Sequence, residues 1–301
     1  MKFSIVTITY NRAHLIGDTI KSVLEQTHTD FEHIIIDDGS IDNTEEVANS
    51  FNDARIRYHK YPKSGHRSFL RNEGFRKSTG QLIGVLDSDD LWVPDKLEIV
   101  LKVFRENPTV EFVLHNVDFL PAGAISWKAF PYYTADRSGN LFLDVLSEKI
   151  LPFPLFTIKK SALEKIGMID ETMIDGQHDF YLRASAELHA YYSHKVLMYM
   201  RKHDQNLSLN YLMSHYDDYF RALENLLIKG VLSESQLMRQ KSKIHNKMAY
   251  IYYTRKQYKM AKSSYLESFR QSTGYFGIKS GLMYLWLSLW QTKHPNDREG
   301  N

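Results

Sequence analysis

The chain has 301 residues, of which 43% are hydrophobic and 25% charged, so it is long enough for one large or two ordinary globular domains. Its formal net charge of +2 supplies no strong field for binding nucleic acid. The absence of cysteine excludes disulfides, thiolate zinc sites and cysteine nucleophiles.

Strands and helices are predicted to alternate through the first hundred residues. Short apolar runs predict strands at residues 3–9, 32–37, 56–59 and 81–86. Helices are predicted between and after them, at residues 16–24, 42–50 and 67–78 and from Pro94 onward. This alternation is typical of a parallel, doubly wound α/β sheet that helices cover on both faces.

The middle of the chain is less regular. Residues 110–119 predict either one long strand or a strand pair, and residues 121–140 are rich in loop formers. Patterns similar to a capping box, at residues 42–45 and 161–164, are expected to start two short helices. A longer helix is predicted at residues 178–189.

After Asn210 the chain is predicted to be helical. Residues 244–270 loosely resemble one helix–turn–helix repeat of the tetratricopeptide type. Residues 278–290 are apolar on nearly every side, with Trp286 and Trp290 one turn apart. Because this stretch is too short to span a bilayer, we expect a docked core helix. The alternative is an interfacial membrane contact, which Lys279 and Lys293 at its ends and its tryptophans suggest.

Acidic residues follow two of the predicted strands at the point where each strand ends. Asp37 and Asp38 end the second strand, and Asp87, Asp89 and Asp90 follow the fourth. Since the carboxyl ends of parallel strands meet at one edge of the sheet, where open α/β folds bind ligands, these acids predict a site for a divalent cation and a nucleotide. The alternative is that the second group caps the helix that starts near Pro94.

Four motifs occur in the order and spacing of a known family. They are SIVTITYN at residues 4–11, DDGSID at 37–42, Arg71-Asn72 with Gly74, and LDSDD at 86–90. The chain therefore resembles the family 2 inverting glycosyltransferases of the GT-A fold. The segments GQHDFYLR at 176–183 and YMRKHDQNLS at 199–208 fit the same family, so the resemblance covers about residues 3–208.

The resemblance implies a GT-A sheet, doubly wound and mostly parallel, flanked by helices. Residues 1–95 would form its nucleotide-sugar-binding half and residues 96–210 its acceptor-binding half. Residues 211–301 would form a helical C-terminal extension.

The resemblance also implies roles for the acidic groups. Asp89 would bind Mn²⁺ or Mg²⁺, Asp87 would bind the ribose or the metal, and Asp90 would orient the loop. Asp38 would accept the N3–H of uracil, or it would simply belong to the turn Asp38-Gly39-Ser40, where Asp and Gly are favoured.

The remaining nucleotide contacts are implied at Thr9, Tyr10, Asn11, Arg71 and Ser88. Tyr10 would pack near the base, with plain core packing as the alternative for its ring. For Arg71 the alternative is a surface ion pair with Glu73 or Asp30.

Asp179 is implied as the general base, which takes the proton of the acceptor hydroxyl as that oxygen attacks opposite the leaving group. His178 stands where the family often has Glu. The alternative for Asp179 is a carboxylate that only complements the N-terminal dipole of its helix. His203 is implied as a metal ligand or a diphosphate contact, with a surface histidine as the alternative.

A cluster of aromatic residues lies in the loop-rich middle of the chain. It is either an acceptor wall, because aromatic faces stack on sugar rings, or a loop anchored by its own apolar side chains. Its members are Trp127, Phe130, Tyr132 and Tyr133.

The resemblance implies a metal-dependent, inverting transferase that moves a sugar from a UDP-sugar to a glycan or lipid-linked acceptor, in bacterial surface polysaccharide or glycoconjugate synthesis. One rival is an inactive scaffold that binds a partner through its helical tail, which the acidic residues disfavour. The other is a sugar-phosphate nucleotidyltransferase, disfavoured because residues 9–13 contain no glycine for a phosphate loop. The first residues, MKFSIVT, lack signal-peptide architecture, so we expect a cytoplasmic protein, free or peripheral at the inner face of the membrane.

Overall fold

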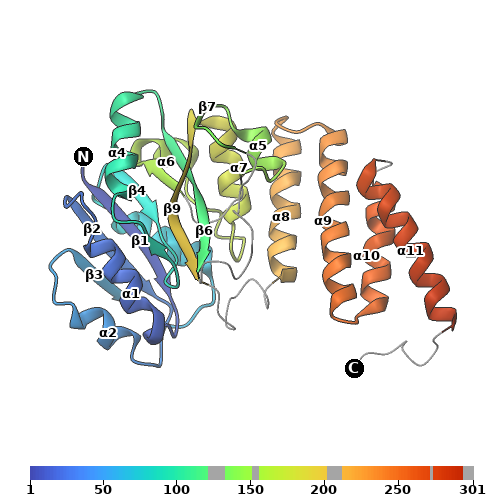
Figure 1. The fold of residues 1–301 in the computed structure, drawn as a ribbon, viewed down its shortest axis with the longest axis horizontal. Helices are drawn as coiled ribbons and strands as arrows, with labels where there is room; N and C mark the ends of the chain where they lie inside the picture. The colour runs from blue at the N-terminus through green and yellow to red at the C-terminus, as the bar shows by residue number, and fades with distance from the viewer. Residues whose placement is uncertain (121–132, 151–155, 202–211, 272–273, 294–301) are drawn as a thin grey trace. The chain divides into compact units, whose positions relative to one another are not determined.

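The computed structural model describes residues 1–120, 133–150, 156–201, 212–271 and 274–293 (Figure 1). Contacts divide the chain into two compact units, Met1–Tyr219 and Phe220–Asn301. The expected boundary at residues 210/211 precedes this division, which falls inside a helix. The division of the first unit at residues 95/96 stays a prediction.

The first unit is built on one nine-stranded sheet with the order β3-β2-β1-β4-β8-β6-β9-β5, and β7 pairs with β9. The pairs β1–β2, β1–β4, β2–β3 and β6–β9 are parallel, whereas β8, β5 and β7 pair antiparallel with their neighbours. The predicted mostly parallel sheet is thus confirmed. The strands are β1 Phe3–Thr9, β2 Phe31–Asp37, β3 Ile56–Lys60, β4 Leu82–Val85, β5 Leu91–Trp92, β6 Phe112–Leu120, β7 Arg137–Gly139, β8 Phe156–Lys159 and β9 Ala190–Arg201.

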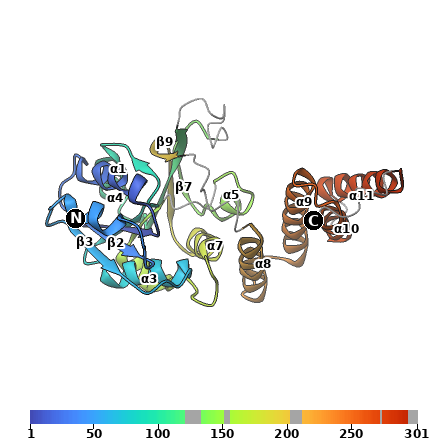
Figure 2. The ribbon, with the colours of Figure 1, turned by 90° about the horizontal axis from the view of Figure 1, so that it is seen from below.

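Helices cover both faces of this sheet (Figure 2). On one face α1 and α4 pack against alternate residues of β1, such as Phe3 and Ile5. On the other face α3 packs against β1 and β2. The helices of the first unit are α1 Ala13–Leu24, α2 Thr44–Ser50, α3 Arg67–Lys77, α4 Lys96–Glu106, α5 Phe142–Leu146, α6 Lys160–Ile166 and α7 Gln177–Glu187.

A close approach of α3 to β1 depends on Gly74. A Cβ atom at this position would lie 2.2 Å from Cγ1 of Val6, which is far inside van der Waals contact. The absence of a side chain therefore lets α3 lie directly on the central strand, and this sets the position of Arg71 one turn earlier on the same helix.

Both capping boxes expected in the first unit are wrong. Helix α2 begins at Thr44 with Asn43 as its N-cap residue, whose side chain makes no cap hydrogen bond. Asp42 instead accepts from the amide and hydroxyl of Thr44, as in an Asx turn. Helix α6 begins at Lys160, one residue before Ser161, and has no side-chain cap.

The long strand β9 was not predicted from sequence, although it pairs with β6 over most of its length. Its register with β6 shifts near Asn116, so the period-two pattern of side chains is interrupted there. For residues 110–119 the structure has one strand rather than a pair, since β6 runs without a break from Phe112 to Leu120.

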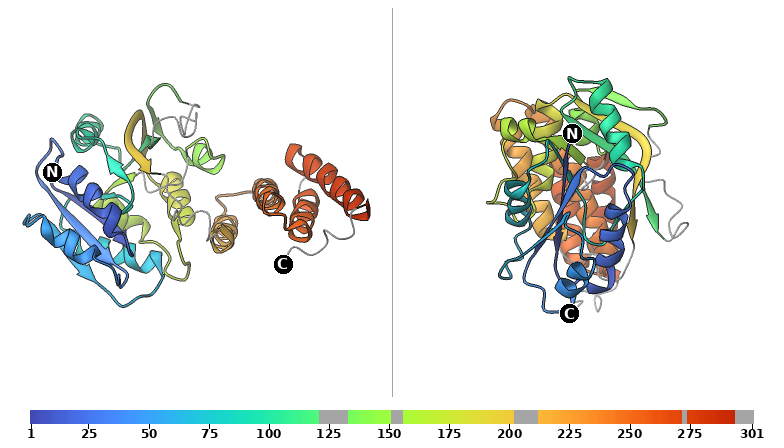
Figure 3. Two further views of the ribbon diagram at one scale, coloured as in Figure 1. Left: turned by 60° about the horizontal axis from the view of Figure 1, so that its bottom comes forward. Right: turned by 90° about the vertical axis from the view of Figure 1, so that its left-hand side faces the viewer.

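The second unit is helical, as predicted. Helix α8, Leu212–Ile228, spans the division between the units, and α9 Glu234–Thr254, α10 Tyr258–Gln271 and α11 Tyr275–Lys293 follow. Helix α10 packs against both α9 and α11 (Figure 3). Ser233 and Gln236 form a complete capping box at the start of α9.

The first turns of α8 belong to the first unit for a specific reason. Asp218 accepts a hydrogen bond of 2.9 Å from the backbone amide of Asp175, and the Tyr219 ring stacks on His178 at 4.1 Å. Within the described residues, none of the helices is both long and apolar enough to cross a membrane.

Candidate active site

The carboxyl ends of β1, β2 and β4 meet at one edge of the sheet. Thr9 pairs with Asp37 across β1 and β2, and the amide of Asp38 donates to the Thr9 carbonyl at 2.9 Å. On the other side of β1 the amide of Leu86 donates to the Val6 carbonyl. The chain that continues from each strand therefore delivers both acidic groups to the same edge.

Three carboxylates form a cluster directly after β4. Oxygens of Asp87, Asp89 and Asp90 all lie within 4.8 Å of one another. Burial raises the pKa of Asp87 to about 6, Arg71 opposes the rise, and the charge of Asp89 adds to it. The pKa of Asp90 is raised well above its usual value, first by burial and then by Asp89 and Asp87. Such crowded carboxylates fit a hard divalent cation, which prefers oxygen ligands and would relieve their repulsion.

The loop that carries this cluster is held from two sides. Arg201, at the end of β9, donates its amide to Asp90 at 3.1 Å and its Nε to the Asp89 carbonyl. The Thr19 hydroxyl of α1 lies 2.9 Å from the carbonyl oxygen of Ser88. Asp90 thus takes part in the contacts that hold this loop, and its expected orienting role stays a prediction. Sequence reasoning missed both Thr19 and Arg201 as holders of the loop.

Arg71 is buried beside the acidic cluster. Its Nη1 donates to Asp175 Oδ1 at 2.7 Å, and its Nη2 lies 3.6 Å from Asp87 Oδ1. The alternative of a surface pair with Glu73 is wrong, because Glu73 bonds to Arg76 and Tyr61 instead. Asp175 was not singled out from the sequence, since no local pattern marks it.

The Asp38 carboxylate is enclosed by the loop after β3. It accepts from Lys63 Nζ at 2.6 Å, from the amide and hydroxyl of Ser64, and from the amide of Gly65. Burial acts to raise its pKa, but these donors lower the pKa below its ordinary value. The same Lys63 ammonium lies 3.3 Å from the ring centroid of Tyr10. One lysine therefore bridges the two residues expected to recognise the base.

Thr9 and Asn11 differ in their environment. The Thr9 hydroxyl oxygen is buried at the strand edge and makes no hydrogen bond to any residue that the structure describes. Asn11 adopts a left-handed backbone with φ of 49°, which Asn tolerates better than most residues. Its side-chain oxygen accepts from the amide of Ile41, so this residue shapes the turn after β1.

Asp179 lies in the first turn of α7 and is 4% exposed. Its Oδ2 accepts from Arg183 Nε at 2.6 Å, and the same guanidinium donates to the carbonyls of Ile166 and Met168. The carboxylate is thus half of a buried ion pair within α7, and its partner Arg183 ties this helix to the end of α6 and the loop that follows. Its role as a base stays a prediction.

Several expected contributors lie outside the described residues, namely His203, Trp127, Phe130 and Tyr132. Tyr133 is described, and its hydroxyl donates to Asp144 at 2.5 Å while its ring packs against Tyr192. This contact supports a loop anchor at Tyr133.

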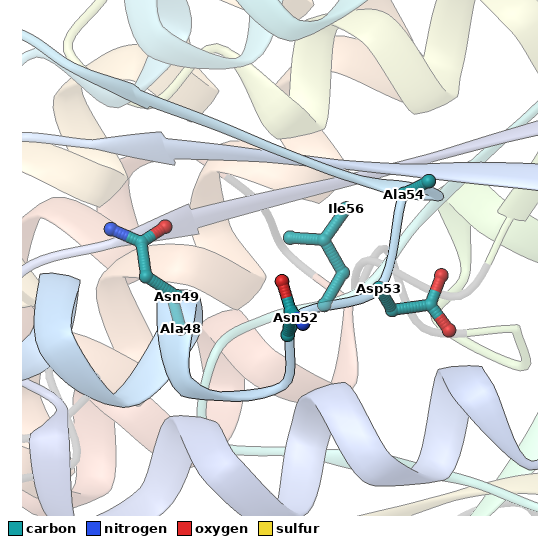
Figure 4. A pocket seen from close by; sticks show the side chains of 6 residues that line it. All are labelled: Ala48, Asn49, Asn52, Asp53, Ala54 and Ile56. Atoms are coloured by element: carbon teal, nitrogen blue, oxygen red, sulfur yellow. The ribbon is translucent and has the colours of Figure 1, made fainter.

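A separate hollow of about 310 Å³ lies between the end of α2 and the start of β3 (Figure 4). Because β3 begins at Ile56, this hollow is at the amino edge of the parallel strands, opposite the acidic cluster. It therefore has no part in the candidate site. Its lining residues are Ala48, Asn49, Asn52, Asp53, Ala54 and Ile56.

Comparison with known proteins identifies relatives of this chain. Glycosyl transferase family 2 matches residues 4–167. An uncharacterized glycosyltransferase of Nostoc sp. is 36% identical over 123 residues, which cover 40% of this chain and 38% of that protein. The Escherichia coli protein WfgD, named a UDP-Glc:alpha-D-GlcNAc-diphosphoundecaprenol beta-1,3-glucosyltransferase, is 34% identical over 127 residues, covering 42% of this chain and 49% of that protein. In both comparisons less than half of the relative's length is aligned.

Solved structures share the fold. S. aureus TarS 1–349 in complex with UDP has a TM-score of 0.64 at 15% identity, covering 99% of this chain and 89% of that one. A mannosyltransferase from Pyrobaculum calidifontis, in complex with GDP-Man and Mn²⁺, has a TM-score of 0.59 at 16% identity, covering 96% and 83%. At this level of identity the likeness shows the fold alone, which is GT-A.

Proposed function

Because this chain belongs to glycosyl transferase family 2, we propose that it transfers a sugar from a nucleoside diphosphate sugar, of the UDP class, to an acceptor hydroxyl with inversion at the anomeric carbon. The observation that carries the proposal is the carboxylate cluster of Asp87, Asp89 and Asp90 at the carboxyl edge of β4. The UDP complex of TarS, which shares this fold, supports the choice of donor.

Asp89 and Asp87 are the residues that would hold Mn²⁺ or Mg²⁺. The Mn²⁺ complex of the P. calidifontis enzyme supports a metal of this kind. When bound, the cation supplies positive charge for the diphosphate as it leaves. Arg201 and Thr19 keep the loop in place, and Ser88 within that loop would face the nucleotide.

Tyr10 and Asp38 would receive the base, and the Thr9 hydroxyl, which has no hydrogen-bond partner among the described residues, lies at the same edge. All four donors on Asp38 come from residues 63–65. A carboxylate has about four acceptor positions, so a base N–H has to displace one donor. Lys63 is the exchangeable one, because its side chain is flexible and partly exposed.

Arg71 would position the leaving group. Its guanidinium cannot lose its proton, so it stays cationic at any working pH. Asp175 and Asp87 hold it from two sides. Asp179 is the proposed general base, and the proton of the acceptor hydroxyl would pass to its carboxylate as the new glycosidic bond forms.

The acceptor is proposed to be a glycan or a lipid-linked glycan of a bacterial surface polymer. This rests on the names of two relatives. WfgD is named for a diphosphoundecaprenol-linked acceptor, and TuaG of Bacillus subtilis, 36% identical over 105 residues that cover 34% of this chain and 42% of that protein, is named for teichuronic acid biosynthesis.

A binding and turnover experiment tests the proposal. Calorimetry with UDP and Mn²⁺, followed by measurement of UDP release from a panel of UDP-sugars, should show cation-dependent binding and turnover for the wild type. Asp89→Ala should lose the cation-dependent part of UDP binding. Asp95→Ala is the matched control, because Asp95 is an exposed residue at the start of α4, and it should behave as wild type. A folded wild-type chain that binds no nucleotide with or without Mn²⁺ would leave only the scaffold interpretation.

A further inference from the structure

One face of α11 in the second unit presents large apolar side chains to solvent. They recur every three or four residues, with Leu285 and Trp286 adjacent, so they lie on a single side of the helix. Their exposed fractions lie between 45% and 72%, which is unusual for six such residues on one helix face. We name this set the α11 face, and it comprises Tyr275, Ile278, Leu282, Leu285, Trp286 and Leu289.

The opposite side of α11 is lined mainly by small and polar residues. Ser280 is fully buried, and its hydroxyl donates to Ser268 at 2.8 Å and accepts from Asn246 at 2.6 Å. A Cβ atom at Gly281 would lie 2.8 Å from Phe269 of α10, so the two helices approach closely. Leu287 is the large apolar residue of α11 that is fully buried.

This arrangement reverses the usual pattern of a surface helix, in which apolar residues face the core. Small residues at a helix contact and large apolar residues outside are typical of helices that face lipid. The inner side of α11 is packed against α10 and α9, and Trp286, at the edge of the α11 face, also contacts Tyr253 of α9. Among the described residues of α11, the α11 face is the side that exposes large apolar groups.

The charges around the α11 face are positive. Residues 275–293 contain no Asp or Glu, while Lys279 lies exposed on α11 itself. On the neighbouring helix α10, Glu267 pairs with Arg270, so it adds no net negative charge. Lysine, tryptophan and tyrosine around an apolar surface are the residue types of the membrane–water interface.

We propose that the α11 face docks on the surface of an anionic lipid bilayer, with α11 lying in the plane of the interface. The apolar side chains would enter the boundary between headgroups and acyl chains, and Lys279 would meet anionic headgroups. A second copy of this chain fits less well, because a pairing of two α11 faces would bury Lys279 of each copy against a helix that has no carboxylate to pair with it. The inference goes beyond the proposed function, since it depends on the second unit alone.

Vesicle binding by the full chain tests this inference. Flotation with phosphatidylcholine vesicles, with and without phosphatidylglycerol, should show binding that depends on the anionic lipid. The double variant Leu282→Glu with Leu285→Glu should weaken binding about tenfold or more, and both side chains are exposed, so the fold should be retained by circular dichroism. Met238→Glu is the matched control, since Met238 is 54% exposed on α9 and lies off the α11 face.

Two outcomes would overturn the inference. One is a wild-type chain that binds neither kind of vesicle, and the other is a double variant that binds as tightly as the wild type. If the wild type binds no vesicles, and light scattering shows that it is a dimer whereas the double variant is a monomer, the α11 face instead pairs with a second copy. UDP binding, measured in the same samples, reports separately on the proposed function.

Discussion

Substitution of Asp179 by asparagine would separate the catalytic role of this residue from its structural role. The amide keeps the shape of the carboxylate and can still accept from Arg183 Nε, but the charge is lost. The two other contacts of the guanidinium, to the carbonyls of Ile166 and Met168 at 2.6 and 2.8 Å, stay in place. The variant should therefore fold, with a weaker contact between residues 179 and 183 inside α7.

The expected magnitudes follow from these contacts. A hydrogen bond to a charged group contributes about 1.5–3 kcal/mol and a neutral one about 0.5–1.5 kcal/mol. Replacing the first by the second at this buried pair should lower the free energy of unfolding by about 1–2 kcal/mol. Removal of a general base should lower turnover by about 10²–10⁴-fold, far more than such destabilisation causes in a protein that is still folded.

The assay is UDP release at a temperature where each variant is folded, with stability measured by urea unfolding. Arg183→Lys is the matched control, because lysine keeps a cation near Asp179 but lacks the planar fork that reaches both carbonyls. It should lose a similar amount of stability yet retain turnover within about threefold, since the base is intact. A folded Asp179→Asn chain with turnover near that of the wild type would refute the role of Asp179 as general base. Its only remaining role would be the structural ion pair with Arg183.

Gly74→Ala should cost about 1–3 kcal/mol of unfolding free energy by overpacking, because its Cβ would collide with Val6; urea unfolding measures this, and an unchanged midpoint would contradict it. Burial lowers the pKa of Lys96 in the folded chain well below its ordinary value of 10.5. Because the unfolded chain then binds more protons than the folded chain, the free energy of unfolding should rise with pH toward 10.5, by up to about 1.4 kcal/mol per pH unit. Lys96→Met should remove this slope in unfolding curves at pH 7 and 9, and an equal slope in both proteins would count against it. Lys63→Ala should tighten UDP binding about two- to fivefold. A cation–π contact of about 0.5–1 kcal/mol no longer has to be broken, and Asp38 gains an open acceptor position. Weaker binding in calorimetry would mean that Lys63 itself contacts the nucleotide.

The parallel half of the sheet and its acidic edge could be predicted from the sequence because the signals are local. Strands β1 and β2 are apolar runs buried on both faces, and such runs are recognisable without knowledge of their partners. The rule that parallel strands end at one edge then places Asp38 and Asp87 together. Family membership followed from the same short motifs.

Pairings between distant residues were decided only by the tertiary structure. Arg71 meets Asp175 across 104 positions of sequence, and Arg201 holds Asp89 and Asp90 from the end of a strand that the period-two pattern did not reveal. The sequence around Asp38 indicates only a turn, and nothing near Lys63 marks it as its partner. Their contact depends on how the chain returns after β3. Which side of α11 is buried was also decided only by the tertiary structure. A helix that is apolar on nearly every side does not indicate from its sequence which side its neighbours cover.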